Sequence, residues 1–427
     1  MSPHFLPVVF LHLGAMKTGT TFLQHLISAN RASLAKAGLF FPGTSWSQQT
    51  LATRDVLGTG TDPRLRARVS GLWERLVAEM LEYDGRASLF SMEFLSFANE
   101  TGAAKVMRSL DGATVHLILT VRDTTGALPA QWQSNARNAG KVSWPEFVHG
   151  AMRYVRRGPE GAGAGGRVFR RAQDIPRMLR VWGEFVPPER FHVITVPPSG
   201  GDRMLLWERF ASVLGVDPET CSMPTIHTNT SLGQPSADLM RRINIRLRGV
   251  PQTEYDPTMK GHLATRVLSR RAPYEQRAKL DLTTRKFAAD WNRTVRRAIE
   301  ASGVDLVGDL GDLPVKVPLQ FRDRRARLVD PDADAILAAA ADARLGMARL
   351  VRLRSRRLRT LGVQVGRLPR IGDRSLPIGP ERWDGFDEPV EAAVDEVSAL
   401  VRRAIDLNNR LREVAPKYAR RKRQRQP

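Results

Sequence analysis

The sequence predicts an α/β fold in which helices cover both faces of a central parallel sheet in three layers, followed by a helical extension. From residue 8 to about residue 315, short apolar runs rich in β-branched residues alternate with segments whose apolar residues recur at helical spacing. Beyond residue 315 the strand-like runs stop. We therefore expect an α/β domain over residues 1–315 and a basic, mainly helical extension over residues 316–427 that ends in a disordered tail.

The order of the expected elements supports this fold class, because strands separated by helices build parallel sheets. Residues 158–166, GPEGAGAGG, interrupt the pattern. We expect them to form a flexible surface loop, of a length that often serves as a lid. The expected strands cover residues 8–13, 88–92, 115–121, 190–196 and 304–310, and the expected helices begin near residues 20, 71, 127, 175, 204, 291, 332 and 388.

Composition and charge narrow the function classes. Of the 427 residues, 42% are hydrophobic and 26% are charged, which is typical of a folded globular protein rather than a disordered one. The formal net charge is +22, and residues 316–427 supply half of it, with 26 Lys and Arg against 15 Asp and Glu. Such an excess favours anionic partners, such as a phosphorylated cofactor or an anionic membrane surface.

The single cysteine, Cys221, excludes an intrachain disulfide and a cysteine-based metal cluster. The first residues lack the basic region, the long apolar run and the cleavage site of a signal peptide. No apolar run reaches the length of about 18 residues that typically spans a membrane. We therefore expect a cytoplasmic protein.

The segment HLGAMKTGTT, residues 12–21, joins the first expected strand to the first expected helix. A Walker A loop needs a lysine directly after its second glycine, but Thr20 follows Gly19 here and the lysine, Lys17, precedes it. This order argues against an ordinary ATP- or GTP-hydrolysing protein. We still expect a phosphate cradle, because a glycine lets the backbone approach an anion and a helix N-terminus offers free N–H groups.

The arrangement K-T-G-T-T on a strand, loop and helix resembles the 5′-phosphosulfate loop of sulfotransferases. The resemblance implies a P-loop-like fold and 3′-phosphoadenosine 5′-phosphosulfate (PAPS) as the sulfuryl donor. The family has a proline just before the lysine, where this chain has Met16. By this resemblance the 5′-phosphosulfate group is bound by Lys17, Thr18, Gly19, Thr20 and Thr21, and Lys17 also acts in catalysis by stabilising the departing phosphate.

Residues 117–138, LILTVRDTTGALPAQWQSNARN, resemble the second cofactor motif of the same family, in which an arginine after a strand and a serine on the next helix bind the 3′-phosphate. Arg122 takes the arginine position, and a guanidinium suits a terminal phosphate. Ala130 stands where the family has its serine, so Ser134, one helical turn further on, is the candidate. The alternative is that Arg122 only pairs with Asp123 or another acidic side chain.

Glu93 is the candidate general base for the proton of the acceptor hydroxyl. It directly follows a short apolar run, in the segment LFSMEFLSF, and sulfotransferases that act on carbohydrates often use a glutamate in a comparable place. The alternatives are that Glu93 is a helix N-terminal carboxylate or a salt-bridge partner. The other candidate residues are His12 and His116, which lie in expected strands where a histidine is more often a core residue, and His227, Asn229 and Ser231 ahead of a later helix.

The last quarter of the chain lies outside the resemblance, which covers residues 8–315. Val390, Val394, Val397, Val401 and Ile405 form an apolar stripe on one expected helix. The neighbouring arginines form either a solvated face or a surface for an anionic membrane, and the absence of base-stacking aromatic patterns makes nucleic acid the weaker alternative. The stripe is too short to predict a coiled coil.

Together these observations predict an enzyme, a cytoplasmic sulfotransferase. It moves a sulfuryl group from PAPS to a hydroxyl of a carbohydrate, lipid or secondary metabolite without a metal, and releases adenosine 3′,5′-bisphosphate. Two other classes stay open: a kinase or NTPase with an altered P-loop, and a non-catalytic cofactor-binding protein that acts through its basic C-terminal region. The sequence leaves the acceptor and the oligomeric state undetermined.

Overall fold

The computed structural model describes residues 6–59, 66–67, 69–198, 200–202, 204–223, 231–321, 327–366 and 377–424, with side chains as far as residue 416. The chain forms two compact units whose segments alternate along the sequence. The first unit comprises residues 1–131, 148–227 and 280–327, and the second comprises residues 132–147, 228–279 and 328–427. The division expected at residue 315 falls within the last segment of the first unit.

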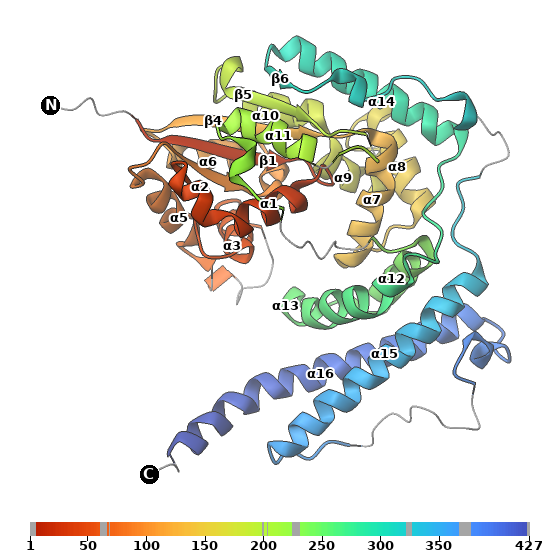
Figure 1. The fold of residues 1–427 in the computed structure, drawn as a ribbon. Coiled ribbons are helices and arrows are strands. Elements are labelled where there is room, and N and C mark those ends of the chain that lie inside the picture. Colours follow the sequence, from red (N-terminus) through yellow and green to blue (C-terminus); the bar gives the residue numbers. More distant parts are fainter. Residues whose placement is uncertain are drawn as a thin grey trace. The chain divides into compact units, whose positions relative to one another are not determined.

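A sheet of six parallel strands forms the centre of the first unit, which confirms the predicted α/β class with a parallel sheet (Figure 1). The strand order is β2-β3-β1-β4-β5-β6. Five of the strands were predicted; the two-residue strand β2 was not, because it is too short to show a period. The strands are β1 (Val8–Gly14), β2 (Leu39–Phe40), β3 (Ala87–Ser91), β4 (Thr114–Val121), β5 (Phe191–Thr195) and β6 (Asp305–Val307).

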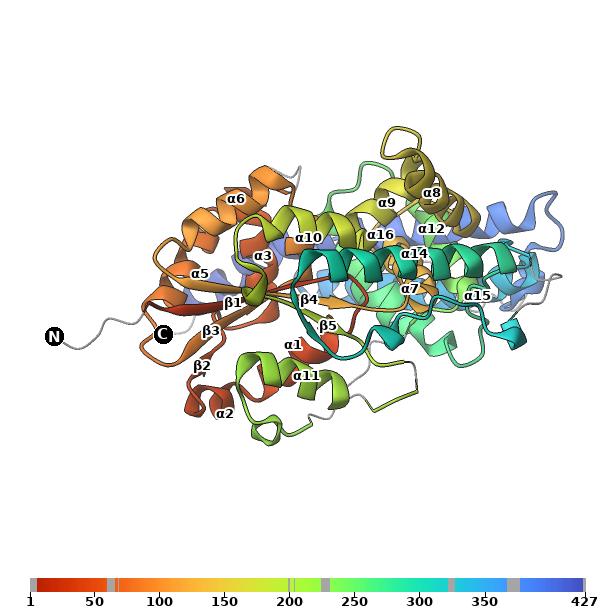
Figure 2. The same cartoon turned by 90° about the horizontal axis from the view of Figure 1, so that it is seen from above.

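Helices cover both faces of this sheet, so the first unit has three layers. Figure 2 shows α1, α2 and α11 on one face and α6, α10 and α14 on the other. The helices of the first unit are α1 (Thr20–Ala29), α2 (Arg31–Lys36), α3 (Trp46–Val56), α5 (Leu72–Leu81), α6 (Glu100–Ser109), α9 (Gly163–Gln173), α10 (Ile175–Gly183), α11 (Met204–Leu214) and α14 (Leu282–Ser302). Two more helices, α7 (Thr124–Arg137) and α8 (Trp144–Arg157), have residues in both units.

The core on the α1 face explains why this segment is helical. Leu23, Leu26 and Ile27 recur at helical spacing and are fully buried with Phe10 of β1. The side chains of α11, among them Trp207, close the same cluster. Burial of such apolar side chains stabilises the fold by roughly 1.5–3 kcal/mol each, and it holds the start of α1 against the end of β1.

The second unit is helical in its described residues. The bounds of its helices are α12 (Gln234–Arg246), α13 (Gln252–Tyr255), the π-helix η4 (Asp256–Val267), α15 (Ala333–Thr360) and α16 (Pro389–Gln424). Short 3₁₀ helices complete the chain: η1 (Glu93–Phe97), η2 (Pro188–Arg190), η3 (Pro218–Thr220), η5 (Leu268–Arg271), η6 (Leu310–Asp312), η7 (Leu319–Phe321) and η8 (Pro380–Trp383). The disordered tail was expected over residues 417–427, but helix α16 includes residues 417–424 of it.

The two long helices of the second unit, α15 and α16, pack along each other (Figure 1). Of the predicted apolar stripe, Val394, Val397, Val401 and Ile405 are buried, while Val390 is half-buried. Three contacts follow one another in the same direction along both helices, so the helices are parallel. They join Arg344 to Glu396 at 4.0 Å, Arg354 Nη1 to the carbonyl of Ala404 at 2.8 Å, and Arg410 Nη2 to the carbonyl of Gln364, just past α15, at 2.9 Å.

The flexible loop predicted at residues 158–166 is wrong for its second half. Helix α9 begins at Gly163, and Gly165 and Gly166 are buried. A Cβ on Gly166 would lie 2.7 Å from the carbonyl oxygen of Gly150, in α8. The glycines therefore let two helices approach closely, which a composition rule for loops does not distinguish from flexibility.

We predict that Gly166→Ala destabilises the protein by about 1–3 kcal/mol, because the added methyl group forces α8 and α9 apart. Gly161→Ala is the matched control, since its Cβ would meet nothing closer than 3.6 Å. Urea unfolding followed by circular dichroism measures both variants. Equal stability of the two would show that the close approach of α8 and α9 carries no constraint.

Candidate functional site

The loop between β1 and α1 has a strained, tightly fixed backbone. Lys17 and Gly19 both have positive φ, of 66° and 86°. This conformation costs a lysine roughly 1–2 kcal/mol, and such strain persists where the surrounding structure determines it. The hydroxyl of Thr18 donates to the carbonyl of Ala15 at 2.6 Å, and the amide of Gln173 donates to the carbonyl of Met16 at 2.8 Å. The loop is thus held from inside and from α9.

The first turn of α1 is open to an anion. Gly19 occupies the N-cap position, no side chain hydrogen-bonds to the cap, and the first turn contains no acidic residue. The first N–H groups of a helix have no partner within the helix, and the helix dipole favours negative charge there. Thr20 is buried and Thr21 is exposed. The predicted phosphate cradle therefore has the required backbone, whereas the hydroxyl of Thr18 is used within the loop.

A buried hydrogen-bond network connects this loop to three strands. His12 Nδ1 lies 2.8 Å from the hydroxyl of Ser91 in β3, and His12 Nε2 lies 3.3 Å from the hydroxyl of Thr120 in β4. Thr120 also hydrogen-bonds to Thr18 at 2.5 Å. Burial lowers the pKa of His12 to about 3, so the ring is neutral. His12, one of the two strand histidines that were candidate bases, is thus a structural residue.

Glu93 follows β3 after one residue, Met92, and its side chain lies against the end of β1. A Cβ on Gly14 would lie 2.7 Å from the Cβ of Glu93, and φ at Gly14 is 86°, so this position requires glycine. The glutamate is 7% exposed. The structure therefore brings Glu93 and the Lys17 loop together at the ends of neighbouring strands.

The amide of Gln24, in α1, holds the Glu93 carboxylate. Gln24 Nε2 donates to Glu93 Oε2 at 2.9 Å and to the carbonyl of Ser91 at 3.0 Å, while Trp46 Nε1 donates to Gln24 Oε1 at 2.9 Å. An indole N–H only donates and a carbonyl only accepts, so these partners determine which way the amide points. Gln24 was not among the predicted site residues; its place four residues after Thr20, on the face of α1 that packs on the sheet, was the available signal.

Arg122 lies at the end of β4, beside the loop. Its Nη1 is 3.4 Å from the carbonyl oxygen of Lys17. A Cβ on Gly126 would lie 3.1–3.3 Å from three atoms of the guanidinium, so this glycine of α7 makes room for it. The neighbouring Asp123 accepts hydrogen bonds from Asn292 Nδ2 at 2.8 Å and from the backbone N–H of Thr125 at 3.0 Å.

Of the remaining candidates, the structure describes Ser134, His116 and Ser231. Ser134 is a buried residue of the second unit, where Asn138 Nδ2 lies 3.5 Å from its hydroxyl. His116 Nδ1 lies 2.9 Å from His192 Nε2, and burial is the main cause that lowers the pKa of His116 to about 4. His227 and Asn229 fall outside the described residues, and Ser231 is exposed.

The strand order places the site residues in a row. The connection from β3 to β4 passes β1, so the order of the sheet reverses between β1 and β4, and parallel sheets bind ligands beyond the carboxyl ends of the strands at such a point. The residues that follow β2, β3, β1 and β4 are Trp46, Glu93, Lys17 and Arg122 respectively. This edge combines a carboxylate, an ammonium group, a guanidinium and a helix N-terminus.

Comparison of the chain with protein-family models, with curated proteins and with solved structures gave no match in any of the three. The resemblance to sulfotransferases therefore depends on the motifs and on the geometry described above. Among the described helices, none is both long enough and apolar enough to cross a membrane.

We predict that His12 makes the stability of the protein depend on pH. The pKa of His12 is about 3 in the folded chain and about 6.5 for a free side chain. Between these values the unfolded chain binds the additional proton, so stability falls as the pH falls from about 6.5 towards 3, by up to about 1.4 kcal/mol per pH unit. Urea unfolding at several pH values measures this slope.

His12→Gln is the variant for comparison, because it removes the titrating ring and keeps hydrogen-bonding atoms. We expect its stability to depend less steeply on pH than that of the wild type. Other groups, His116 included, titrate in both proteins and cancel in the difference. Identical slopes would contradict a buried, neutral His12.

Proposed function

We propose that the protein is a sulfotransferase with a P-loop-like α/β domain, which uses PAPS and transfers the sulfuryl group to an acceptor hydroxyl. The observation that supports it best is that Glu93, Lys17 and Arg122 follow three adjacent strands, β3, β1 and β4, and lie around one strained loop. The transfer needs three groups: a general base, which Glu93 can supply, a cation beside the leaving phosphate, which Lys17 can supply, and a guanidinium for the terminal phosphate, which Arg122 can supply. A cytoplasmic location stays a prediction.

The residues present fit the adenosine cofactor. With Gly19 at the N-cap, no side chain hydrogen-bonds to the first amides of α1, so we assign these amides to the 5′ group, together with the hydroxyls of Thr20 and Thr21. The space over Gly126 accommodates the Arg122 guanidinium, which we assign to the 3′-phosphate. Next to Ala130, Gln131 has a buried Oε1 without a hydrogen-bond partner among the described residues, which makes its amide a candidate for this phosphate. The role of Ser134, in the second unit, stays a prediction.

The chain's own residues have separate tasks in this reaction. When bound, the cofactor supplies the sulfuryl group, which leaves a phosphate oxygen for the acceptor oxygen. Lys17 balances the charge that develops on that phosphate oxygen. Glu93 accepts the proton of the acceptor hydroxyl, and Gln24 orients the carboxylate for this step. The acceptor has to approach on the Glu93 side of Lys17, where the ring of Trp46 is 40% exposed.

We predict that adenosine 3′,5′-bisphosphate binds with micromolar affinity and that Lys17→Ala and Arg122→Ala each weaken it about tenfold or more, since each removes a charge-assisted hydrogen bond to phosphate. Isothermal titration calorimetry measures the affinities. The exposed residues Lys36 and Arg75 provide matched controls, Lys36→Ala and Arg75→Ala, which should bind as the wild type does.

Adenosine 5′-monophosphate separates the two phosphate sites. The wild type should prefer the bisphosphate, Arg122→Ala should lose this preference, and Lys17→Ala should keep it while binding both nucleotides more weakly. Tighter binding of ATP than of the bisphosphate, with turnover of ATP, would instead indicate a kinase or NTPase. Absence of any nucleotide binding would overturn the proposed cofactor.

A further inference from the structure

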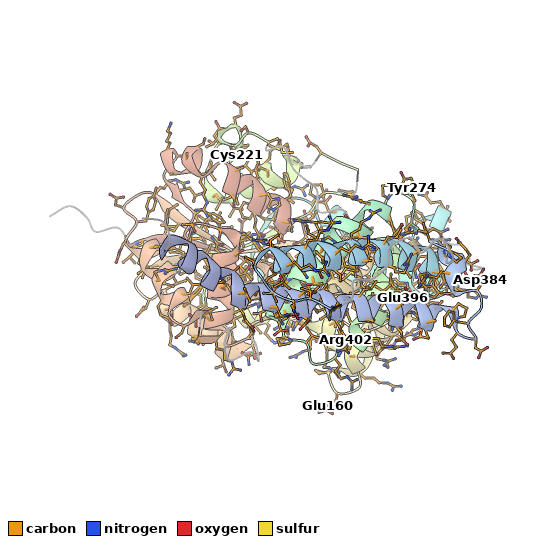
Figure 3. The ribbon with its side chains drawn as sticks, turned by 90° about the horizontal axis from the view of Figure 1, so that it is seen from below. Glu160, Cys221, Tyr274, Asp384, Glu396 and Arg402 are labelled. Carbon is orange, nitrogen blue, oxygen red and sulfur yellow. The ribbon has the colours of Figure 1, made fainter. Side chains whose placement is uncertain are left out.

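The parallel packing of α15 and α16 separates charge along the second unit. Because the helices run in the same direction, their C-terminal halves lie at the same end of the pair. Residues 347–360 of α15 contain six arginines and no acidic residue, and residues 400–424 of α16 contain nine Lys and Arg against two Asp and Glu. The opposite end is acidic; Figure 3 shows Glu396 on α16 on that side of Arg402.

The basic end includes one continuous face of α15. Arg349, Arg352, Arg356, Arg357 and Arg359, together with Leu353 and Thr360, fall within about 160° of the helix surface at 100° per residue. The opposite side of this segment is packed, with Met347, Leu350, Val351, Ser355 and Leu358 buried. We call the first set of seven residues the basic face.

Four of the five arginines of the basic face make no polar side-chain contact within the part of the chain that the structure describes. Arg349, Arg356, Arg357 and Arg359 are exposed, and their side chains make no ion pair or hydrogen bond to the described residues. Elsewhere in the same unit arginines are paired: Arg242 contacts Asp238 and Glu391 at 2.7–2.8 Å. The helix dipole favours cations only in the last turn of α15, so it does not account for Arg349 and Arg356.

Like charges also gather behind this face. The pKa of Arg354 is lowered to about 10, mainly by burial and secondly by the positive charge of Arg412 in α16. Arg354 Nη1 donates hydrogen bonds to Thr258 Oγ1 and to the carbonyl of Ala404, neither of which is a carboxylate. The basic end therefore keeps its positive charge largely uncompensated by carboxylates, and an anionic partner would relieve this repulsion.

We propose that the basic face binds the surface of a membrane that contains anionic phospholipids. The exposed side chain of Leu353 favours a membrane over nucleic acid as the partner. It is 65% exposed in the middle of the arginines, so an apolar side chain can enter the lipid headgroup region while the guanidinium groups bind phosphates around it. The face carries no aromatic side chain that could stack on bases and no amide that could read them.

Vesicle co-sedimentation of the full chain tests the proposal, with phosphatidylcholine vesicles that do or do not contain 30% phosphatidylglycerol. The test variant replaces Arg349, Arg356, Arg357 and Arg359 by Gln, which keeps helix propensity and removes four charges. The control replaces four exposed arginines of the first unit, Arg75, Arg156, Arg167 and Arg180, in the same way, so both variants have the same net charge. Circular dichroism confirms that both fold.

We expect the wild type to bind only the anionic vesicles, and to bind more weakly as salt is raised. The test variant should lose affinity by about a hundredfold or more, because each arginine near the surface contributes independently. The control variant should change by less than about threefold, and Leu353→Gln should weaken binding severalfold.

Three results would overturn the proposal. The first is equal binding to anionic and neutral vesicles, and the second is an equal loss in the control variant. The third is tighter binding to a 20-base-pair RNA duplex than to anionic vesicles, lost in the test variant and unaffected by Leu353→Gln; it would assign the face to nucleic acid. The proposal is independent of the sulfotransferase activity, and none of these measurements requires PAPS.

Discussion

The buried hydrogen bonds of His12 hold together the part of the molecule on which the site depends. The imidazole of His12 links Ser91 in β3 to Thr120 in β4, and Thr120 also hydrogen-bonds to Thr18 in the loop. These groups are fully or almost fully buried, so an unsatisfied member would cost about 1–3 kcal/mol. Because every link is made, the loop keeps its left-handed backbone at Lys17.

The same network explains how residues far apart in sequence become one site. β1, β3 and β4 are adjacent, so fixing their carboxyl ends against one another fixes the starting points of Lys17, Glu93 and Arg122. Two glycines then allow the close approaches, Gly14 to Glu93 and Gly126 to Arg122. Gln24 completes the arrangement by orienting the carboxylate. The site is therefore supported by rigid strand ends rather than by long loops.

Much of this could be read from the sequence, because the signals are local. The apolar run of β1 and the glycines of the loop after it are adjacent in the chain, and so are β3 and Glu93; the structure confirms these strands. The hydrogen bonds of Gln24, Trp46 and Gln173 could not be predicted in this way, since their partners lie 22 to 157 residues away. The buried glycines of α9 look like a loop by composition, and only the contact with α8 shows their function. Likewise, both basic segments could be seen in the sequence. That they lie at the same end of the helix pair follows only from the parallel direction of α15 and α16, which the structure shows.

We propose that the loop from Ala15 to Thr21 holds the 5′ group of an adenosine nucleotide. A crystal structure of the protein with adenosine 3′,5′-bisphosphate tests it most directly. We expect the 5′-phosphate within hydrogen-bond distance of Lys17 Nζ and of the first amides of α1, and the 3′-phosphate on Arg122. A nucleotide bound away from β1 and β4, or one whose 5′-phosphate makes no contact with the loop, would contradict it.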